Sequence, residues 1–188
     1  MDYVKNYFDK FFEHVNNVDC AKIDKIIMEL YGAWKDNKQI FIAGNGGSAT
    51  TAAHMACDLS KGTIDYNDST KRFKVISLTD NIATLSAIGN DLGYENIFSQ
   101  QLMNLAKKED ILIVITASGN SPNILKAVEC AKNLGMKTIG LLGFDGGKAK
   151  NDLDLYLLFN ENHYGRVEDF HLMVEHIITE RLREIIKD

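Results

Sequence analysis

The stretch QIFIAGNGGSA, residues 39–49, decides the fold. Its apolar run, 39–43, ends in glycines and leads directly into a helical pattern, which is typical of a buried parallel strand followed by a tight turn. Similar apolar runs lie at 73–78, 111–116, 138–142 and 153–159, and helical patterns lie between the runs at 48–60, 81–89, 94–107 and 121–134. Strands that alternate with helices pair in parallel and are covered on both faces. The sequence therefore predicts an α/β fold, a three-layer αβα sandwich around a five-stranded parallel sheet.

Helical patterns also flank this unit at both ends. Apolar residues at helical spacing predict two helices within 1–36 and a final helix over about 165–186. We expect a single domain, 1–188, composed of an N-terminal helical hairpin (1–36) and an α/β core with the C-terminal helix (37–188). Two interpretations of the flanking helices stay open: they cover the sheet, or they form a bundle between subunits. The aromatic stripe of the first helix favours the bundle, because such patches usually bind a partner.

Composition narrows the class of protein. The 188 residues include 21 basic and 26 acidic side chains, a net charge of −5, and 45% are apolar. This profile is typical of a globular protein with no general attraction to nucleic acid or to anionic lipid. Three scattered cysteines without a C-x-x-C pair favour a reducing compartment. No apolar run approaches the roughly 18 residues of a membrane span, and the N-terminus lacks a signal-peptide pattern. We expect a cytoplasmic protein.

The first candidate binding segment is the turn Gly44–Ala49. Glycines let the backbone approach a ligand closely, and a helix N-terminus favours an anion. The segment matches G-x-G-x-x-A, but the acidic residue that a dinucleotide site needs about 20 positions later falls in a polar loop. We therefore expect no nucleotide cofactor. A plain strand-to-helix turn is the alternative.

The second candidate segment is Thr116–Pro122, after the third strand. Pro122 suits the first position of a helix, with Ser121 as its N-cap. Three hydroxyls, at 116, 118 and 121, exceed what capping requires. They favour a neutral phosphate cradle over a simple capped turn.

The titratable candidates lie on two helices. His54 and Asp58 are four residues apart and share a helix face. Glu168 and His176 lie eight residues apart on the last helix, a separation of roughly 12 Å along its axis. One metal would bind all four only if the side chains converge. A solvated face is the alternative for the first pair, and the histidines at 163 and 171 are interpreted as surface or packing residues.

Four segments together resemble the phosphoheptose isomerases, a family with the sugar-isomerase (SIS) fold. They are IFIAGNGGSATTAAHMACDL (40–59), LSAIGNDLGYENIFSQQL (85–102), ITASGNSPNILKAVECAKNLGMKTIGLLGFDGGK (115–148) and RVEDFHLMVEH (166–176). The resemblance covers nearly the whole chain. It implies isomerisation of sedoheptulose 7-phosphate to a D-glycero-D-manno-heptose 7-phosphate for lipopolysaccharide or capsule. It also implies a homo-oligomer, a tetramer with active sites between subunits.

The resemblance assigns roles residue by residue. Asp58 and His176 correspond to the acid/base pair. The implied ligands of one zinc ion per subunit are His54, Asp58, Glu168 and His176. The implied substrate-binding residues are Asn45, Gly46, Ser48, Asp91, Thr116, Ser118, Asn120, Ser121 and Glu168, with the hydroxyls at 116, 118 and 121 on the phosphate.

Several positions depart from the family pattern. Asp58 stands in place of a glutamate and reaches about 1.5 Å less far, although a general base must come within hydrogen-bond distance of its proton. Glu168 stands in place of a glutamine and adds negative charge beside the expected metal. Ala117 and Gly165 replace a hydroxyl residue and an aspartate. These changes indicate a divergent member. An isomerase of a related sugar phosphate and a non-catalytic sugar-phosphate sensor or adaptor remain alternatives.

Overall fold

The computed structural model describes residues 2–66 and 71–187 and confirms the predicted fold class. Five parallel strands form one sheet in the order β2-β1-β3-β4-β5. Their bounds are Gln39–Gly44 (β1), Lys74–Ser77 (β2), Ile111–Thr116 (β3), Lys137–Leu142 (β4) and Leu155–Leu158 (β5). The order reverses direction between β1 and β3, and such a switch point is where open α/β sheets bind their ligands.

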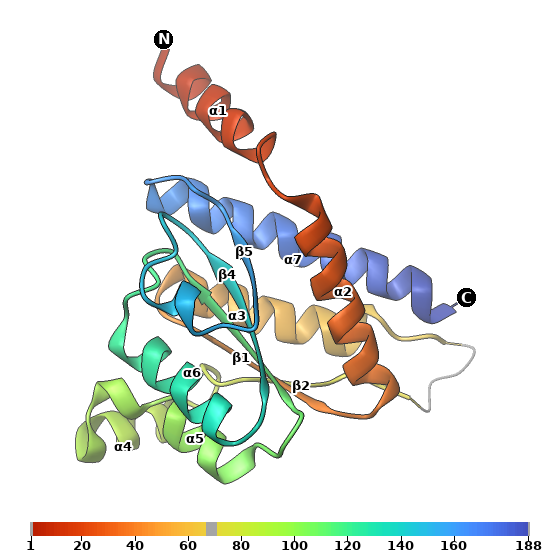
Figure 1. Ribbon diagram of the computed structural model, residues 1–188, viewed down its shortest axis with the longest axis vertical. Coiled ribbons are helices and arrows are strands. Elements are labelled where there is room, and N and C mark those ends of the chain that lie inside the picture. Colours follow the sequence, from red (N-terminus) through yellow and green to blue (C-terminus); the bar gives the residue numbers. More distant parts are fainter. Residues whose placement is uncertain (1, 67–70, 188) are drawn as a thin grey trace.

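Helices cover both faces of the sheet (Figure 1). One face carries α2 (Cys20–Lys35), α3 (Gly47–Cys57) and α7 (Tyr164–Lys187), and the other carries α5 (Ser99–Leu105) and α6 (Pro122–Asn133), with α4 (Ile82–Leu92) beside them. Successive side chains of a strand point to opposite faces of the sheet, so each face has its own core. Ile40 and Ile42 pack with α2, α3 and α7, whereas Phe41 packs with α5 and α6. No helix in the described ranges combines the length and the apolar character that a membrane crossing needs.

Two predicted helices are divided in the structure. The helix expected at 48–60 ends at Cys57, and a π-helical turn, Asp58–Gly62, continues it. Such turns are frequent at functional sites, and here the turn begins at a candidate catalytic residue. The helix expected at 94–107 is a 3₁₀ turn, Tyr94–Asn96, followed by α5. Gly93, with a φ of 92°, ends α4 directly before this turn.

The two N-terminal helices do not fold back on each other as a hairpin. Helix α1 (Asp2–Val15) leads away from the core, and α2 continues in a similar direction (Figure 1). One side of α1 is anchored: Tyr7 donates a hydrogen bond to Asp169 at 2.8 Å, and Phe11 packs on Phe159. The other side of α1 is exposed, and none of its 14 residues is buried. The apolar stripe of α1 is wider than the surface of the same chain against which this helix packs.

Candidate active site

Two tight turns occupy the switch point, as the sequence predicts. The first turn follows β1, and its Gly46 has a φ of 55°, a left-handed conformation that glycine adopts without a steric penalty. A side chain at Gly44 would overlap the Ser48 carbonyl. Ser48 itself is buried in the first turn of α3. The backbone N–H groups at this end of α3 therefore lie at the carboxyl edge of the sheet, where they suit an anionic or polar ligand.

An amide pair joins the first turn to α6. The Asn45 amide donates to Asn123 Oδ1 at 2.9 Å, and the Asn123 amide donates back to Asn45 Oδ1 at 2.8 Å. The Tyr94 hydroxyl also donates to Asn45 Oδ1, at 3.2 Å. Asn123 was not predicted from the sequence, because its position in the first turn of α6 is also that of an ordinary helix residue. The pair fixes the orientation of the Asn45 side chain.

A cavity of about 660 Å³ opens beside this pair. Asn45 and Ser121, one from each predicted segment, line it together with Tyr94, Asn123 and Lys126. The two candidate segments therefore meet at one cavity. Neither Asp58 nor His176 lines this cavity.

The second turn, after β3, is packed against the loop that follows β4. Gly119 has a φ of 62°, and a side chain there would overlap the Gly146 carbonyl. Within the turn, Thr116 Oγ1 accepts a hydrogen bond from the Gly119 N–H at 3.2 Å, and Ser118 Oγ accepts one from the Asn120 N–H at 3.3 Å. The Asn120 side chain accepts from the Lys148 N–H at 3.1 Å. Hydroxyls at 116 and 118 thus shape the turn as well as being candidate ligands.

Ser121 differs from the other two hydroxyls. It is the N-cap residue of α6, with Pro122 in the first turn as predicted, but its side chain makes no capping hydrogen bond. Its hydroxyl lines the cavity instead. Among the predicted phosphate ligands, this is the one whose hydroxyl the fold leaves free to bind.

A histidine–carboxylate cluster forms where α3 packs against α7. Ligand atoms of His54, Asp58, Glu175 and His176 all lie within 4.8 Å of one another. His54 Nε2 lies 3.5 Å from Asp58 Oδ2, and the rings of His54 and His176 are 5.1 Å apart. The side chains of His54 and His176 are 45% and 48% exposed, so the cluster opens to solvent on one side. The donor set, two imidazoles and two carboxylates, is one that could hold a metal ion.

Glu175 is the member of this cluster that the sequence analysis missed. Its side chain is fully buried, and His176 Nε2 lies 3.3 Å from its carboxylate. Burial, together with the neighbouring Asp58 carboxylate, raises the pKa of Glu175 to about 8. The overlooked signal is periodicity: Val174 and Ile178 mark the buried face of α7, and a glutamate between them is unusual there.

Glu168, expected as the fourth metal ligand, is not in the cluster. Its carboxylate lies directly over Gly47, in the first turn of α3. The reason is helical rise, because residue 168 lies about 10 Å before residue 175 along α7. A carboxylate at this end of α3 interacts favourably with the helix dipole. Asp91 also lies apart: it is exposed on α4 and accepts a hydrogen bond from Asn90 at 2.8 Å.

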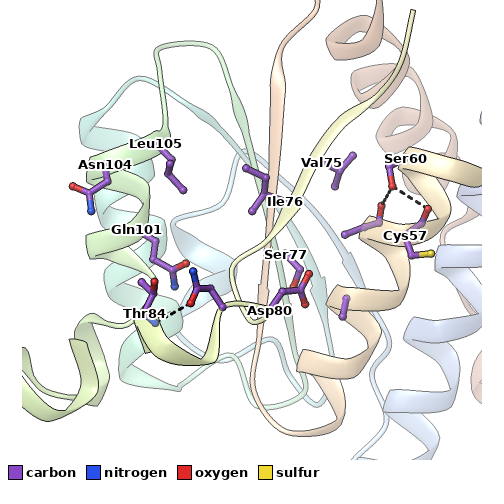
Figure 2. Close-up of a pocket in the computed structure, with 13 residues that line it drawn as sticks. Cys57, Ser60, Val75, Ile76, Ser77, Asp80, Thr84, Gln101, Asn104 and Leu105 are labelled. Carbon is purple, nitrogen blue, oxygen red and sulfur yellow. Dashed lines mark hydrogen bonds between the residues drawn. The ribbon is translucent and has the colours of Figure 1, made fainter. Parts of the chain in front are cut away.

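A second cavity, of about 570 Å³, lies between α3, the edge strand β2 and α5 (Figure 2). Figure 2 shows Cys57 and Ser60 on one side of it and Asp80 and Gln101 toward the other. None of the predicted site residues lines this cavity. It lies on the side of α3 that faces β2, whereas His54 belongs to the cluster with α7.

Comparison with known proteins defines the class of this chain. The SIS domain family matches residues 2–143, a range that includes α3 and both tight turns of the switch point. The chain is 45% identical over 142 residues to a phosphoheptose isomerase of Helicobacter pylori (strain P12), covering 76% of this chain and 72% of the relative. It is 40% identical over 160 residues to one of Clostridium acetobutylicum, covering 85% and 80%.

Solved structures agree with this class. The phosphoheptose isomerase from Francisella tularensis superimposes with a TM-score of 0.87 at 29% identity, over 97% of both chains. The chain therefore belongs to the phosphoheptose isomerases, within the SIS domain family.

Proposed function

We propose that this chain converts sedoheptulose 7-phosphate to a D-glycero-D-manno-heptose 7-phosphate, as an early step toward the heptose of lipopolysaccharide or capsule. The observation that carries the proposal is that Asp58 and His176, distant in sequence, meet beside His54. Relatives named phosphoheptose isomerase support the substrate. An aldose–ketose isomerase needs a pair of groups that can move protons between neighbouring atoms.

The reaction is an internal proton transfer. A base removes the proton from the carbon next to the carbonyl, an enediol forms, and the proton returns to the neighbouring carbon. Another proton moves between the two oxygens, so nothing is gained or lost overall. We assign these two transfers to Asp58 and His176, whose side chains come from facing helices.

Substrate binding is assigned to the switch point. Thr116, Ser118, Asn120 and Ser121 would hold the phosphate through hydroxyl, amide and backbone donors. Contacts to the sugar are assigned to Asn45, Gly46, Ser48, Asp91 and Glu168. The cavity shared by Asn45 and Ser121 supports this arrangement, since it joins the two segments.

We also propose one zinc ion per subunit at the α3–α7 cluster. Its residues fit the ion, because His54, Asp58 and His176 present zinc-type donors within 4.8 Å and a buried carboxylate completes the group. Bound there, zinc would polarise the substrate carbonyl.

Assembly as a homotetramer is supported by two separate apolar faces. One is the stripe Tyr3, Val4, Phe8 and Phe12 on α1. The other gathers exposed side chains around α4, α5 and β2: Ile76, Ile82, Leu92, Met103 and Leu105. Figure 1 shows α1 at one end of the molecule, and α4 and α5 at the other. Two distinct self-complementary contacts on one chain generate four copies with two-fold symmetry. The family resemblance further implies that the active sites lie between subunits.

We place the protein in the cytoplasm. All three cysteines are free thiols, and Cys20 and Cys57 are exposed, which favours a reducing environment.

An isomerisation assay tests the proposed function. Asp58→Asn and His176→Ala should each lower turnover of sedoheptulose 7-phosphate about 10²- to 10⁴-fold, because each removes a proton-transfer group. Asp24→Asn, an exposed carboxylate on α2, is the matched control and should keep wild-type turnover. Binding of the substrate by the wild-type protein without conversion would replace the enzyme with a sugar-phosphate sensor.

A further inference from the structure

The described part of the chain contains few buried polar atoms without a hydrogen-bond partner, and all of them lie on α7. They belong to His171, Glu175 and Thr179, which are four residues apart and so form one stripe along the helix. The buried carboxyl group is the most costly of these, because its oxygens lose water and gain no well-directed hydrogen bond, although His176 Nε2 lies 3.3 Å away. The fold keeps Glu175 in this state directly against the α3–α7 cluster.

We propose that Glu175 is the fourth protein ligand of the divalent cation at this cluster and the residue on which tight binding depends. This inference rests on the metal site of the proposed function and assigns it a residue that the family resemblance does not. Geometry supports it first, since the Glu175 carboxylate lies within 4.8 Å of ligand atoms from His54, Asp58 and His176. The other three side chains are partly exposed, and Glu175 forms the buried floor beneath them.

Charge supports the proposal independently. The cluster holds two carboxyl groups, and when both bind a metal as carboxylates their total charge of −2 is neutralised by a divalent cation. Without the cation, Asp58 and Glu175 face each other in a partly dry environment, where like charges are unfavourable. A bound cation would supply a partner for Glu175 Oε1 and Oε2, which accept no hydrogen bond in the described part of the chain.

The donor set also selects among cations. Two imidazole nitrogens suit zinc and similar transition metals, whereas magnesium and calcium prefer oxygen ligands. We therefore expect zinc to bind and millimolar magnesium not to compete with it.

Zinc affinity of the full-length, metal-free protein tests the proposal, measured by competition with a chromophoric chelator. Glu175→Gln preserves the shape of the side chain and should weaken zinc binding about 100-fold or more, since loss of even a supporting residue costs 10- to 100-fold. Glu175→Asp keeps the carboxylate but places it farther from the other ligands, because the side chain is one methylene shorter. The zinc affinity of this variant should therefore fall between those of the wild type and Glu175→Gln. The matched control is Glu180→Gln, the same change at an exposed position of α7, which should keep wild-type affinity. Glu168→Gln tests the ligand that the family resemblance implies.

The outcomes separate cleanly. Wild-type zinc affinity in Glu175→Gln would overturn the proposal, and so would a loss confined to Glu168→Gln or a wild-type protein that binds no zinc. If Glu175→Gln fails to fold, Glu175→Asp decides, because unchanged affinity there contradicts a ligand role. Turnover of sedoheptulose 7-phosphate by the wild-type protein is measured separately. Zinc bound through Glu175 in a protein without turnover would leave this inference standing and remove the proposed function.

Discussion

Two regions of this molecule bury polar groups near the sheet, and they do so in opposite ways. At the switch point, the side chains of Asn45 and Asn123 satisfy each other, and the turn after β3 is closed by its own hydrogen bonds. Along α7, the buried polar atoms of His171, Glu175 and Thr179 have no partner in the described structure. The polar groups of the first region satisfy one another within one chain. Those of the second region would be satisfied only if another molecule or ion binds there.

The difference indicates that the two regions have different roles, one in substrate binding and the other in reactivity. A pre-formed turn binds its ligand without reorganisation, which favours a rigid floor for the phosphate and sugar. Unsatisfied buried groups reduce stability until a ligand relieves them, and such groups gather at reactive sites. Three changes would break or sharpen this comparison, and they follow in order of their expected effect on the free energy of unfolding.

The largest effect is expected from Gly119→Ala. The new side chain would require a left-handed alanine and would overlap the Gly146 carbonyl, so we expect a loss of about 3 kcal/mol or more in the free energy of unfolding. Denaturant unfolding measures it. Gly32→Ala is the matched control, because its side chain meets open space on helix α2 and should instead stabilise by about 0.5–1 kcal/mol. Equal stability of the two variants would show that the turn is not the rigid region described here.

His171 should lower the free energy of unfolding as the pH becomes acidic. Burial lowers the pKa of its ring to about 4, from an ordinary 6.5. Since the folded state resists protonation of this ring, the contribution of His171 to stability is present above pH 6.5 and is lost as pH falls through 4, about 3 kcal/mol in all. Glu175 acts in the opposite direction, because its raised pKa of about 8 stabilises the fold as pH falls below that value, so the wild-type slope is the sum of the two effects. Thermal unfolding of metal-free protein between pH 7 and 4 measures the slope.

Two variants identify the source of that slope. His171→Leu removes the contribution that acid abolishes, so this variant should gain stability relative to the wild type as pH falls from 6.5 to 4, whereas His163→Gln, at a less buried position, should leave the profile unchanged. A His171→Leu profile that runs parallel to that of the wild type would assign acid sensitivity to another group and weaken the contrast between the two regions.

The smallest effect on unfolding is expected outside both regions, on α1. Phe8→Ser combined with Phe12→Ser changes two exposed side chains, so the stability of the single chain should change by less than about 1 kcal/mol. The molar mass in solution, measured by light scattering, should nevertheless fall below that of the wild-type assembly. An unchanged mass would mean that this stripe does not join subunits.

The sequence predicted the sheet, its parallel direction and the two turns correctly. It could do so because strand runs such as Ile111–Thr116 and the signal Ser121-Pro122 are local patterns with local physical causes. It also identified His54, Asp58 and His176, which the structure brings together. The resemblance to a family supplied their roles.

Other features depended on packing between distant segments. The pairing of Asn45 with Asn123 needs β1 and α6 side by side, and the open stripe of α1 needs a helix that leaves the core. The sharpest case is the choice between two glutamates of one helix. Helical spacing places 168 and 175 on α7, but only the way α7 packs across α3 sets Glu175 against His54 and Glu168 over Gly47. Sequence alone determined which chemical groups were present, and tertiary packing decided which of them meet, because relative helix position depends on contacts that no local pattern encodes.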